Sequence, residues 1–520
     1  MDKLMGVINA IRWFFRRWFW NGLAWIKMAA NKPLDIPLPP ASQPQITPMP
    51  LAQAVPELPI ANVLVCPPDA IPADEVAKSK QVVYTLQLWL YKHYSPMQAG
   101  LPQIDADAQK ALQRAFTWLH RSKYPAPELP AEFLGSPDLG ALAVRGPFAC
   151  YTTLESNGIY QWDVGSLSNY EHHEGLHKLG AKVRFRVEPT QRALIAFEIS
   201  TELGVAHPGD GTWELSKKIA LCAVSTHLSL VRHFNWVHLA GGAHLAIASR
   251  NHLPATHPLC RLVWPYYYGT QQSNDIVTRG QMVRGGDFET TFSLTFEGMC
   301  QLFGDTYLAY PFVVNDPEAD ARQRRLREGG FDTPSQDNLE ALFELMHKHA
   351  LDYLSAYYRD TPASTATDAI KSDAVVLDWL DALNALIPNG VGVTRDNVTL
   401  QSLARLVARF IYLATVQHEL MGSYLWNYQL WTQRQPVRVY RSGEREPLDV
   451  YQRLVNANYN LNVTRRALMC DFGYLALDAP GRDAMAKFER ELAELQAEID
   501  ARPWAVWKMA PAELKVNINA

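Results

Sequence analysis

The chain has 520 residues, 48% of them hydrophobic, a formal net charge of −4 and an isoelectric point near 6.4. A chain of this length and composition can bury one large core. The slightly negative charge argues against a nucleic-acid-binding protein, because such proteins need a basic surface for phosphates. The 6 cysteines are scattered without C-x-x-C spacing. We therefore expect free thiols, and neither a disulfide framework nor a cysteine metal site.

The first 30 residues, MDKLMGVINAIRWFFRRWFWNGLAWIKMAA, have the pattern of an amphipathic helix. Large apolar side chains gather on one face, and Arg12, Arg16, Arg17 and Lys27 gather on the opposite face. Arginines in the middle make the segment a poor transmembrane span, and it lacks the uncharged core of a cleavable signal peptide. A positive, tryptophan-rich helix favours an anionic bilayer surface, so we expect a peripheral membrane protein on the cytoplasmic side. The alternative is a helix that packs on the protein's own body.

Proline recurs every few residues between residues 31 and 75, which predicts an extended linker or an arm that wraps around the body. From about residue 76 to residue 520 the pattern is globular. Alternation of apolar and polar residues around Pro189 and Thr190 predicts a β-hairpin. Helical periodicity covers residues 79–95, 106–121, 337–358, 374–386, 397–433, 447–460 and 481–501.

Histidines cluster in the middle of the chain, at His227, His233, His238, His244, His252 and His257. Neutral imidazole suits Fe, Zn, Cu and Ni, and a helix that brings two imidazoles to one side needs only a third ligand and a carboxylate to close a site. His418 lies in a second apolar helical stretch, and the chain ends in a free carboxylate at Ala520. Three imidazoles and one carboxylate make a plausible shell for redox-active iron. The same histidines can also be ordinary core, surface or capping residues.

A different metal motif occurs upstream. The segment His173-Glu174-Gly175-Leu176-His177 fits H-E-x-x-H, which on a helix would bind zinc with the glutamate as general base. Glycine interrupts this stretch and the hairpin begins by Val183, so little helix can form. We expect a polar loop or a short helix here and not a metalloprotease site.

The residues around the central histidines resemble the lipoxygenase family. Trp213 and Lys217 match that family's W-x3-K pattern before the ligand helix, and His233 lies at the family's spacing from Trp213. The tail WKMAPAELKVNINA is similar to the family's terminal pattern. The resemblance covers roughly residues 150–310 and 400–520, whereas the family's N-terminal β-sandwich module is not recognisable. Matches in the segment after the ligand helix and in the tail are Ile247, Ala248, Leu253, His257, Pro258, Leu259, Leu262, Pro265, Pro511, Leu514 and Ile518.

The resemblance implies one large, mainly helical catalytic domain over residues 76–520, with a small β-hairpin or sheet region. It also implies that His227, His233, His418 and the Ala520 carboxylate hold a non-heme iron ion, which manganese can replace. Five residues separate His227 from His233, where the family usually has four. In a regular helix such positions point about 120° apart, so both can face one ion only if the helix is irregular, as the family's helix is. The rival ligand is His238, whose other interpretation is a core or supporting histidine.

Glycines occupy three positions that matter in such a site. Gly422 stands where the family usually places asparagine as a weak ligand, so that coordination position would be open or filled by water. Gly285 or Gly286 falls near the position where the family uses a small residue to admit oxygen to one face of the substrate. Glycine pairs are also common in turns.

The activity implied by the resemblance is that of a lipoxygenase-like dioxygenase, which inserts O2 into a polyunsaturated fatty acid and yields a lipid hydroperoxide. The expected partners are the lipid substrate, O2 and an anionic membrane surface, and we expect a monomer. Two alternatives stay open, namely an oxygenase of this fold that acts on a nonlipid substrate and a non-catalytic protein that binds lipid or metal.

Overall fold

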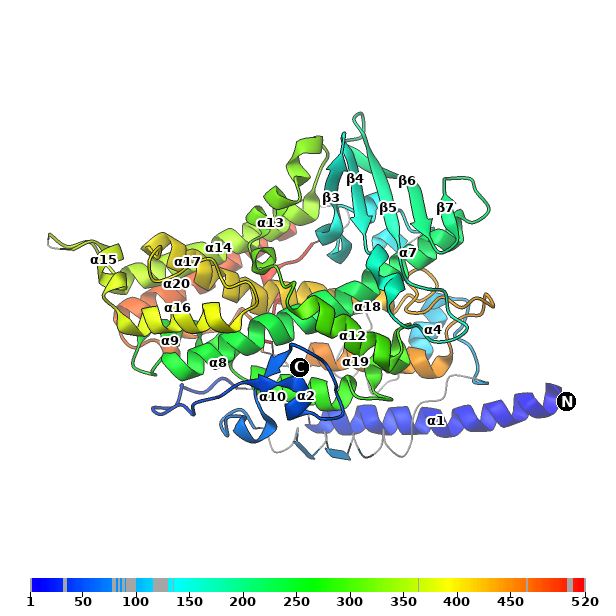
Figure 1. Ribbon diagram of the computed structural model, residues 1–520, viewed down its shortest axis with the longest axis horizontal. Helices are drawn as coiled ribbons and strands as arrows, with labels where there is room; N and C mark the ends of the chain where they lie inside the picture. The colour runs from blue at the N-terminus through cyan, green and yellow to red at the C-terminus, as the bar shows by residue number, and fades with distance from the viewer. Residues whose placement is uncertain are drawn as a thin grey trace.

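The computed structural model describes residues 2–30, 35–76, 81–82, 85–86, 89, 100–115, 130–133, 135–362, 364–463, 466–502 and 508–518. A helical body carries a five-stranded antiparallel sheet at its edge (Figure 1). The body helices include α4 (Ala108–Ala115), α6 (Leu139–Leu142), α7 (Trp213–His227), α8 (Ala243–His252), α9 (Pro258–Tyr267), α10 (Thr270–Ile276), α11 (Asp287–Thr291), α12 (Phe296–Tyr307), α13 (Pro317–Gln323), α14 (Pro334–Tyr357), α15 (Ala366–Lys371), α16 (Ala374–Leu386), α17 (Leu400–Tyr412), α18 (Leu425–Gln429), α19 (Leu448–Val463) and α20 (Ala479–Ala501).

The sheet has the strand order β3-β4-β5-β6-β7, and every neighbouring pair is antiparallel. The predicted hairpin is confirmed, because β5 and β6 pair with Val187 opposite Leu194. Helix α6 lies close against β6. A side chain at Gly140 would meet the Leu194 carbonyl oxygen at 1.9 Å, so this contact requires glycine. The strands are β3 (Thr153–Ser156), β4 (Ile159–Asp163), β5 (Lys182–Glu188), β6 (Ala193–Thr201) and β7 (Gly204–Ala206).

The predicted helices agree with the structure where the structure describes them. Residues 374–386 coincide with α16 and residues 481–501 fall in α20, while α14 ends at Tyr357, one residue before the end of the predicted helix 337–358. Most of residues 79–95 and the end of residues 106–121 lie outside the described residues. The mainly helical fold class is therefore confirmed.

The proline-rich segment is an arm on the body, which decides between the two predicted possibilities. Beyond residue 34 it forms the short elements β1 (Met49–Pro50), α2 (Leu51–Ala54) and β2 (Leu64–Val65). The Ile46 amide donates to Asn251 Oδ1 at 2.7 Å, and Asn251 Nδ2 donates back to the Ile46 carbonyl at 2.8 Å. Glu75 is fully buried and accepts from Arg250 Nη2 at 2.8 Å. These paired bonds fasten both ends of the arm to α8.

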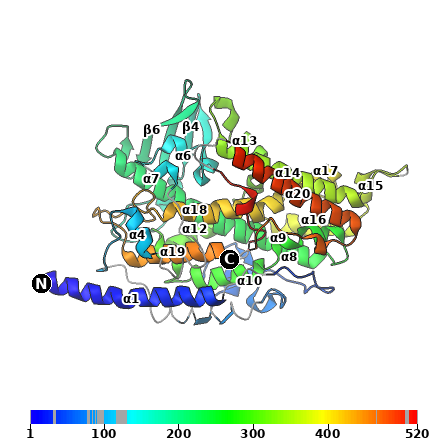
Figure 2. The same ribbon diagram turned by 180° about the vertical axis from the view of Figure 1, so that it is seen from behind.

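Helix α1 (Asp2–Ala30) confirms the predicted N-terminal helix. It lies along one side of the body, and its first turns extend past the end of the neighbouring helices in both views (Figures 1 and 2). Among the described residues, no helix is long and apolar enough to cross a membrane.

Candidate metal centre

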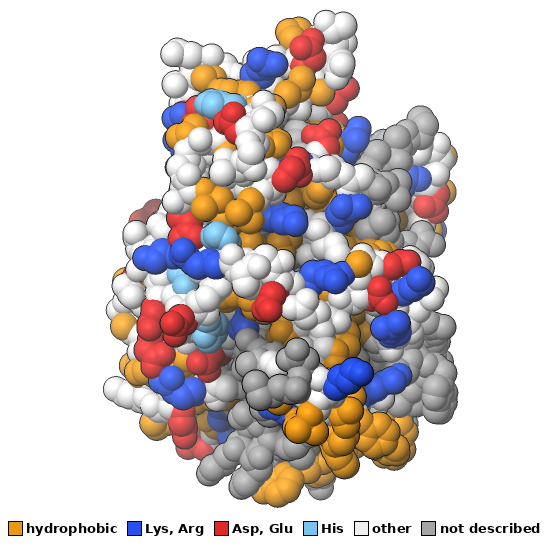
Figure 3. Space-filling model, turned by 90° about the vertical axis from the view of Figure 1, so that its right-hand side faces the viewer, with side chains coloured by type: hydrophobic (Ala, Val, Ile, Leu, Met, Phe, Trp, Pro, Cys, Tyr) orange, Lys and Arg blue, Asp and Glu red, His pale blue; other side chains and the backbone are white. Residues whose placement is uncertain are grey.

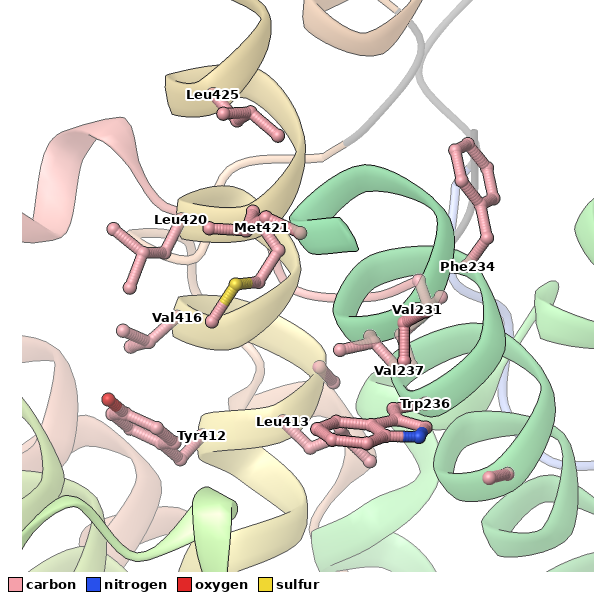
Figure 4. Packing of buried hydrophobic residues seen from close by; sticks show 14 of the residues in the cluster. Val231, Phe234, Trp236, Val237, Tyr412, Leu413, Val416, Leu420, Met421 and Leu425 are labelled. Atoms are coloured by element: carbon pink, nitrogen blue, oxygen red, sulfur yellow. The ribbon is translucent and has the colours of Figure 1, made fainter. Parts of the chain in front are cut away.

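Two long helices with π-helical winding form the middle of the body. In the first, regular helix α7 ends at His227 and continues as the π-helical segment η5 (Leu228–Gly242) and then α8. In the second, α17 continues as the π-helical segments η9 (Leu413–Gln417) and η10 (Leu420–Tyr424) and then α18. Buried apolar side chains fill the space around the two helices where they lie side by side (Figure 4). A π-helix bonds each amide to the carbonyl five residues earlier, so residues five apart lie above one another.

This winding brings three histidines together in the core. His233 and His238 are five positions apart on η5, and His418 lies between η9 and η10. One ring nitrogen of each lies within 4.8 Å of those of the other two. His238 Nε2 and His418 Nε2 are 3.0 Å apart, and all three residues are at most 1% exposed. Three buried imidazoles that converge on one point make a donor set that suits a transition-metal ion.

Asn274 on α10 determines how His238 presents its ring. Asn274 Nδ2 donates to the His238 carbonyl oxygen at 3.0 Å, so its other atom, Oδ1, faces His238 Nδ1, also at 3.0 Å. A carbonyl oxygen only accepts, so Nδ1 carries the proton. Nε2 is then unprotonated, and its lone pair is directed at the three-histidine cluster, as a metal ligand requires. Asn274 was not predicted from the sequence, because no motif links it to the histidines.

His227 lies apart from this cluster. Its Nδ1 is 2.6 Å from the hydroxyl of Tyr151, and its ring packs against Tyr151 and Trp236. Burial, reinforced by the charge of Arg232, lowers the pKa of His227 to about 3, so the ring is neutral. The predicted place of His227 in this cluster is therefore corrected, because the structure groups His238, and not His227, with His233 and His418. The physical reason is that π-helical winding begins only after His227. Four residues separate His233 from His238, which is the usual spacing of the two helix ligands in the family that the sequence resembles.

Gly422 on η10 lies directly against the His233 ring. A Cβ atom placed there would be 3.0 Å from His233 Cε1 and 3.1 Å from His233 Nε2. Such contacts are tighter than ordinary van der Waals distances, so a side chain at residue 422 would push on the ring. The glycine both leaves out a side-chain ligand and makes room for His233.

The C-terminal tail approaches the same helix. Ala520 lies outside the described residues, so its carboxylate stays a predicted ligand. Val516, Asn517 and Ile518 are buried, and a side chain at Gly242 would meet Ile518 Cδ1 at 2.4 Å. Asn517 Nδ2 donates to the Tyr268 carbonyl at 2.9 Å and fixes the tail beside α9. The last described residues therefore contact η5 four positions after His238.

Gly285 and Gly286 form a turn. Gly285 has φ of +75°, which favours glycine, and a side chain at Gly286 would be 2.5 Å from the Gln281 carbonyl oxygen. These backbone constraints explain both glycines, and their role in admitting oxygen stays a prediction.

The H-E-x-x-H segment is a loop, as predicted. Its two histidines have separate partners, since His173 Nε2 is 2.8 Å from the Glu289 carbonyl oxygen and His177 Nδ1 is 2.6 Å from Glu202 Oε1. The segment therefore does not place two histidines on one helix face.

A mainly helical domain in which two π-containing helices bring three histidines together is the architecture that the sequence resemblance implied. Solved structures with this fold include a calcium-dependent 11R-lipoxygenase, with a TM-score of 0.73 and 17% identity over 91% of this chain and 78% of that one. The manganese lipoxygenase of Gaeumannomyces graminis has a TM-score of 0.71 and 12% identity, over 92% of this chain and 96% of that one. A lipoxygenase in complex with arachidonate has a TM-score of 0.69 and 14% identity, over 93% of this chain and 84% of that one.

Two lipoxygenase sequences are also similar to part of the chain. A mouse polyunsaturated fatty acid (12S)/(13S)-lipoxygenase of epidermal type is 23% identical over 278 residues, which are 50% of this chain and 41% of that protein. Linoleate 9S-lipoxygenase 1 of Phaseolus vulgaris is 24% identical over 234 residues, 41% of this chain and 26% of that protein. These matches span less than half the length of either relative, and no family model matches the chain. The protein has the lipoxygenase fold and is similar in sequence to lipoxygenases over part of its length.

Proposed function

We propose that this protein is a non-heme metal dioxygenase that inserts O2 into a polyunsaturated fatty acid and yields a lipid hydroperoxide. The observation that carries the proposal is the convergence of His233, His238 and His418 inside a lipoxygenase fold. Iron, when bound there, would supply the one-electron chemistry that removes a hydrogen atom from the carbon between two cis double bonds. Manganese is the alternative metal, and one structure with the same fold is a manganese lipoxygenase.

The three imidazoles would bind the metal together with the main-chain carboxylate of Ala520. Neutral imidazoles with a single anionic ligand avoid over-stabilising the oxidised metal, which has to accept an electron. Asn274 keeps the His238 Nε2 lone pair directed inward. Gly422 contributes no ligand atom, because it has no side chain.

Aromatic side chains exclude water from one side of the cluster. The Phe234 ring stacks on His238 with centroids 5.4 Å apart, and Phe288 lies 4.2 Å from Phe234. This apolar cover protects a carbon radical from side reactions and fixes the plane of the His238 ring.

A cavity beside His418 is the proposed place for the acyl chain. Its free volume is about 20 Å³ in this structure, so the lining side chains would have to move apart to admit an acyl chain. Gln417 and Leu420, on either side of His418 and Glu419, contribute to its wall. Its apolar lining residues include Leu339, Tyr412, Leu420 and Met421. An apolar wall next to the histidine helix favours a hydrocarbon substrate.

Two arginines line the same cavity, and one of them, Arg324, is paired with Asp320 at 2.8 Å, which leaves the charge of Arg232 for a ligand. The Arg232 guanidinium lies 4.7 Å from the ring centre of Tyr151 and 5.5 Å from that of Trp236. Its Nε has no hydrogen-bond partner among the described residues, while Nη2 donates to the Cys150 carbonyl at 3.4 Å and the guanidinium also interacts with the Tyr151 side chain. We propose that Arg232 receives the carboxylate of a free fatty acid. Arg232→Leu should then raise KM for the acid and leave KM for its methyl ester unchanged, whereas Arg322→Leu on the exposed face of α13 should change neither.

The main test combines metal analysis with turnover. Purified protein should contain about one iron or manganese ion per chain, consume O2 with linoleic or arachidonic acid, and produce conjugated-diene absorbance. His233→Ala should lose both metal and turnover. Bound metal without O2 consumption on these acids would instead favour an oxygenase with a nonlipid substrate or a non-catalytic protein, the two alternatives that the missing side-chain ligand at Gly422 keeps open.

A further inference from the structure

Helix α1 contacts the body through a side that carries Arg12 and Arg16 in its first half and Trp20 and Leu23 in its second half. Trp20, 1% exposed, donates from Nε1 to Asp449 Oδ1 on α19, and the Arg453 guanidinium lies 5.1 Å from the centre of its ring. Arg16 is buried on the same side, and Arg12 Nη1 comes close to Gly100. Leu23 and Trp20 form a small apolar cluster of their own. The helix is thus fixed to α19 in a defined rotation.

The opposite side of α1 exposes large apolar residues to solvent. Trp18 is 69% exposed and Phe15 is 60% exposed. The other exposed apolar residues of this face are Leu4, Met5, Val7, Ile8, Ile11, Phe14 and Trp25. An ordinary surface helix does the reverse and turns its apolar side toward the core. A contiguous exposed apolar patch marks a contact with a partner or a membrane, and Figure 3 shows hydrophobic side chains gathered at this lower edge of the molecule.

The charge around the patch indicates whether a second copy of this chain or a membrane covers it. Lys3 and Arg17 are exposed beside it, and Asp2 is the sole acidic residue of α1. A second copy of this chain would bring two positive patches together, which repulsion disfavours. An anionic lipid surface supplies the opposite charge and an apolar layer at once, and tryptophan and phenylalanine suit that boundary.

We propose that the outer face of α1 is the membrane-binding surface of this protein, with α1 lying in the plane of an anionic bilayer and the body above it. Because Trp20 fixes α1 to α19, the bound helix would also fix the orientation of the body relative to the membrane. The inference rests on the placement of α1 and is independent of the proposed dioxygenase activity.

The experiment measures sedimentation of the full chain with vesicles of phosphatidylcholine alone or with added phosphatidylglycerol. Phe14→Ser combined with Trp18→Ser should weaken binding to the anionic vesicles by roughly tenfold or more, since each substitution removes an aromatic ring that would be buried in the bilayer. Arg17→Glu should weaken binding to anionic vesicles only. Val205→Ser removes an equally exposed apolar residue on β7, at the far side of the molecule from α1, and should leave binding unchanged.

Thermal unfolding and metal content of each variant show whether the fold is intact. Equal vesicle binding by the Phe14/Trp18 double variant and the unmodified chain would overturn the proposal. So would a concentration-dependent dimer that this double variant abolishes, because the patch would then be an interface between two copies.

Discussion

Replacement of Gly422 by alanine should weaken metal binding although it adds only one methyl group. The new Cβ would lie 3.0 Å from His233 Cε1 and 3.1 Å from Nε2, so the ring must retreat by a few tenths of an ångström. Metal–ligand distances tolerate only about ±0.2 Å. We therefore expect metal affinity to fall by roughly 10- to 100-fold, or about 1.4–2.8 kcal/mol.

The same substitution has an opposing effect on the helix. Alanine is favoured over glycine in a helix interior by about 1 kcal/mol, whereas overpacking in a core costs about 1–3 kcal/mol. The apo protein should thus be destabilised by no more than about 2 kcal/mol, so lost metal would not reflect unfolding. Asparagine at residue 422 meets the same contact through its Cβ and should not simply add a ligand.

The assay titrates each protein with a chelator of known affinity and reads the retained metal. Gly22→Ala is the matched control, because Gly22 is also helical and a Cβ atom placed there would have no neighbour within 4 Å among the described residues. That variant should bind metal normally. Unchanged metal affinity in Gly422→Ala would refute the inferred contact between Gly422 and His233.

Three further predictions concern groups around the centre and in the core. Asn274→Ala should lower metal affinity by about 10- to 100-fold, because His238 Nδ1 loses its acceptor; chelator competition measures this, and an unchanged value would remove Asn274 from the site. Burial lowers the pKa of His349 to about 3, far below its unfolded value near 6.5, so its contribution to stability is complete above pH 6.5 and is lost as the pH falls toward 3. At pH 5.5 the loss for this residue should be about 1.4 kcal/mol in urea unfolding, and His349→Leu should flatten that part of the pH profile; an equally steep profile would contradict the assignment. Tyr151→Phe should leave metal content unchanged, since the hydroxyl it removes bonds to His227 and not to the cluster; metal loss would place His227 nearer the ion than the structure does.

The sequence predicted the helical fold class and two of the three clustered histidines, His233 and His418. The third histidine was uncertain because a pattern read at regular helical spacing does not locate the start of π-helical winding. That start, after His227, brings His238 to the cluster. Asn274 was missed for a different reason, since its contact with His238 joins two helices without a local signal.

The N-terminal region illustrates the same limit. The apolar and basic pattern of residues 1–30 predicted an amphipathic helix and left open whether it lies on a bilayer or on the body. Only tertiary contacts, such as Trp20 with Asp449, determine which side faces inward. Likewise, the proline pattern did not distinguish a linker from an arm, because the paired bonds of Ile46 and Asn251 join residues 205 positions apart.

The central claim is that His233, His238 and His418 hold one metal ion and His227 does not. Metal stoichiometry of purified His238→Ala and His227→Ala tests it most directly, because both remove a histidine from the same long helix. We predict that His238→Ala loses bound metal while His227→Ala keeps about one ion per chain. Full metal occupancy in His238→Ala, with loss in His227→Ala, would contradict this ligand set.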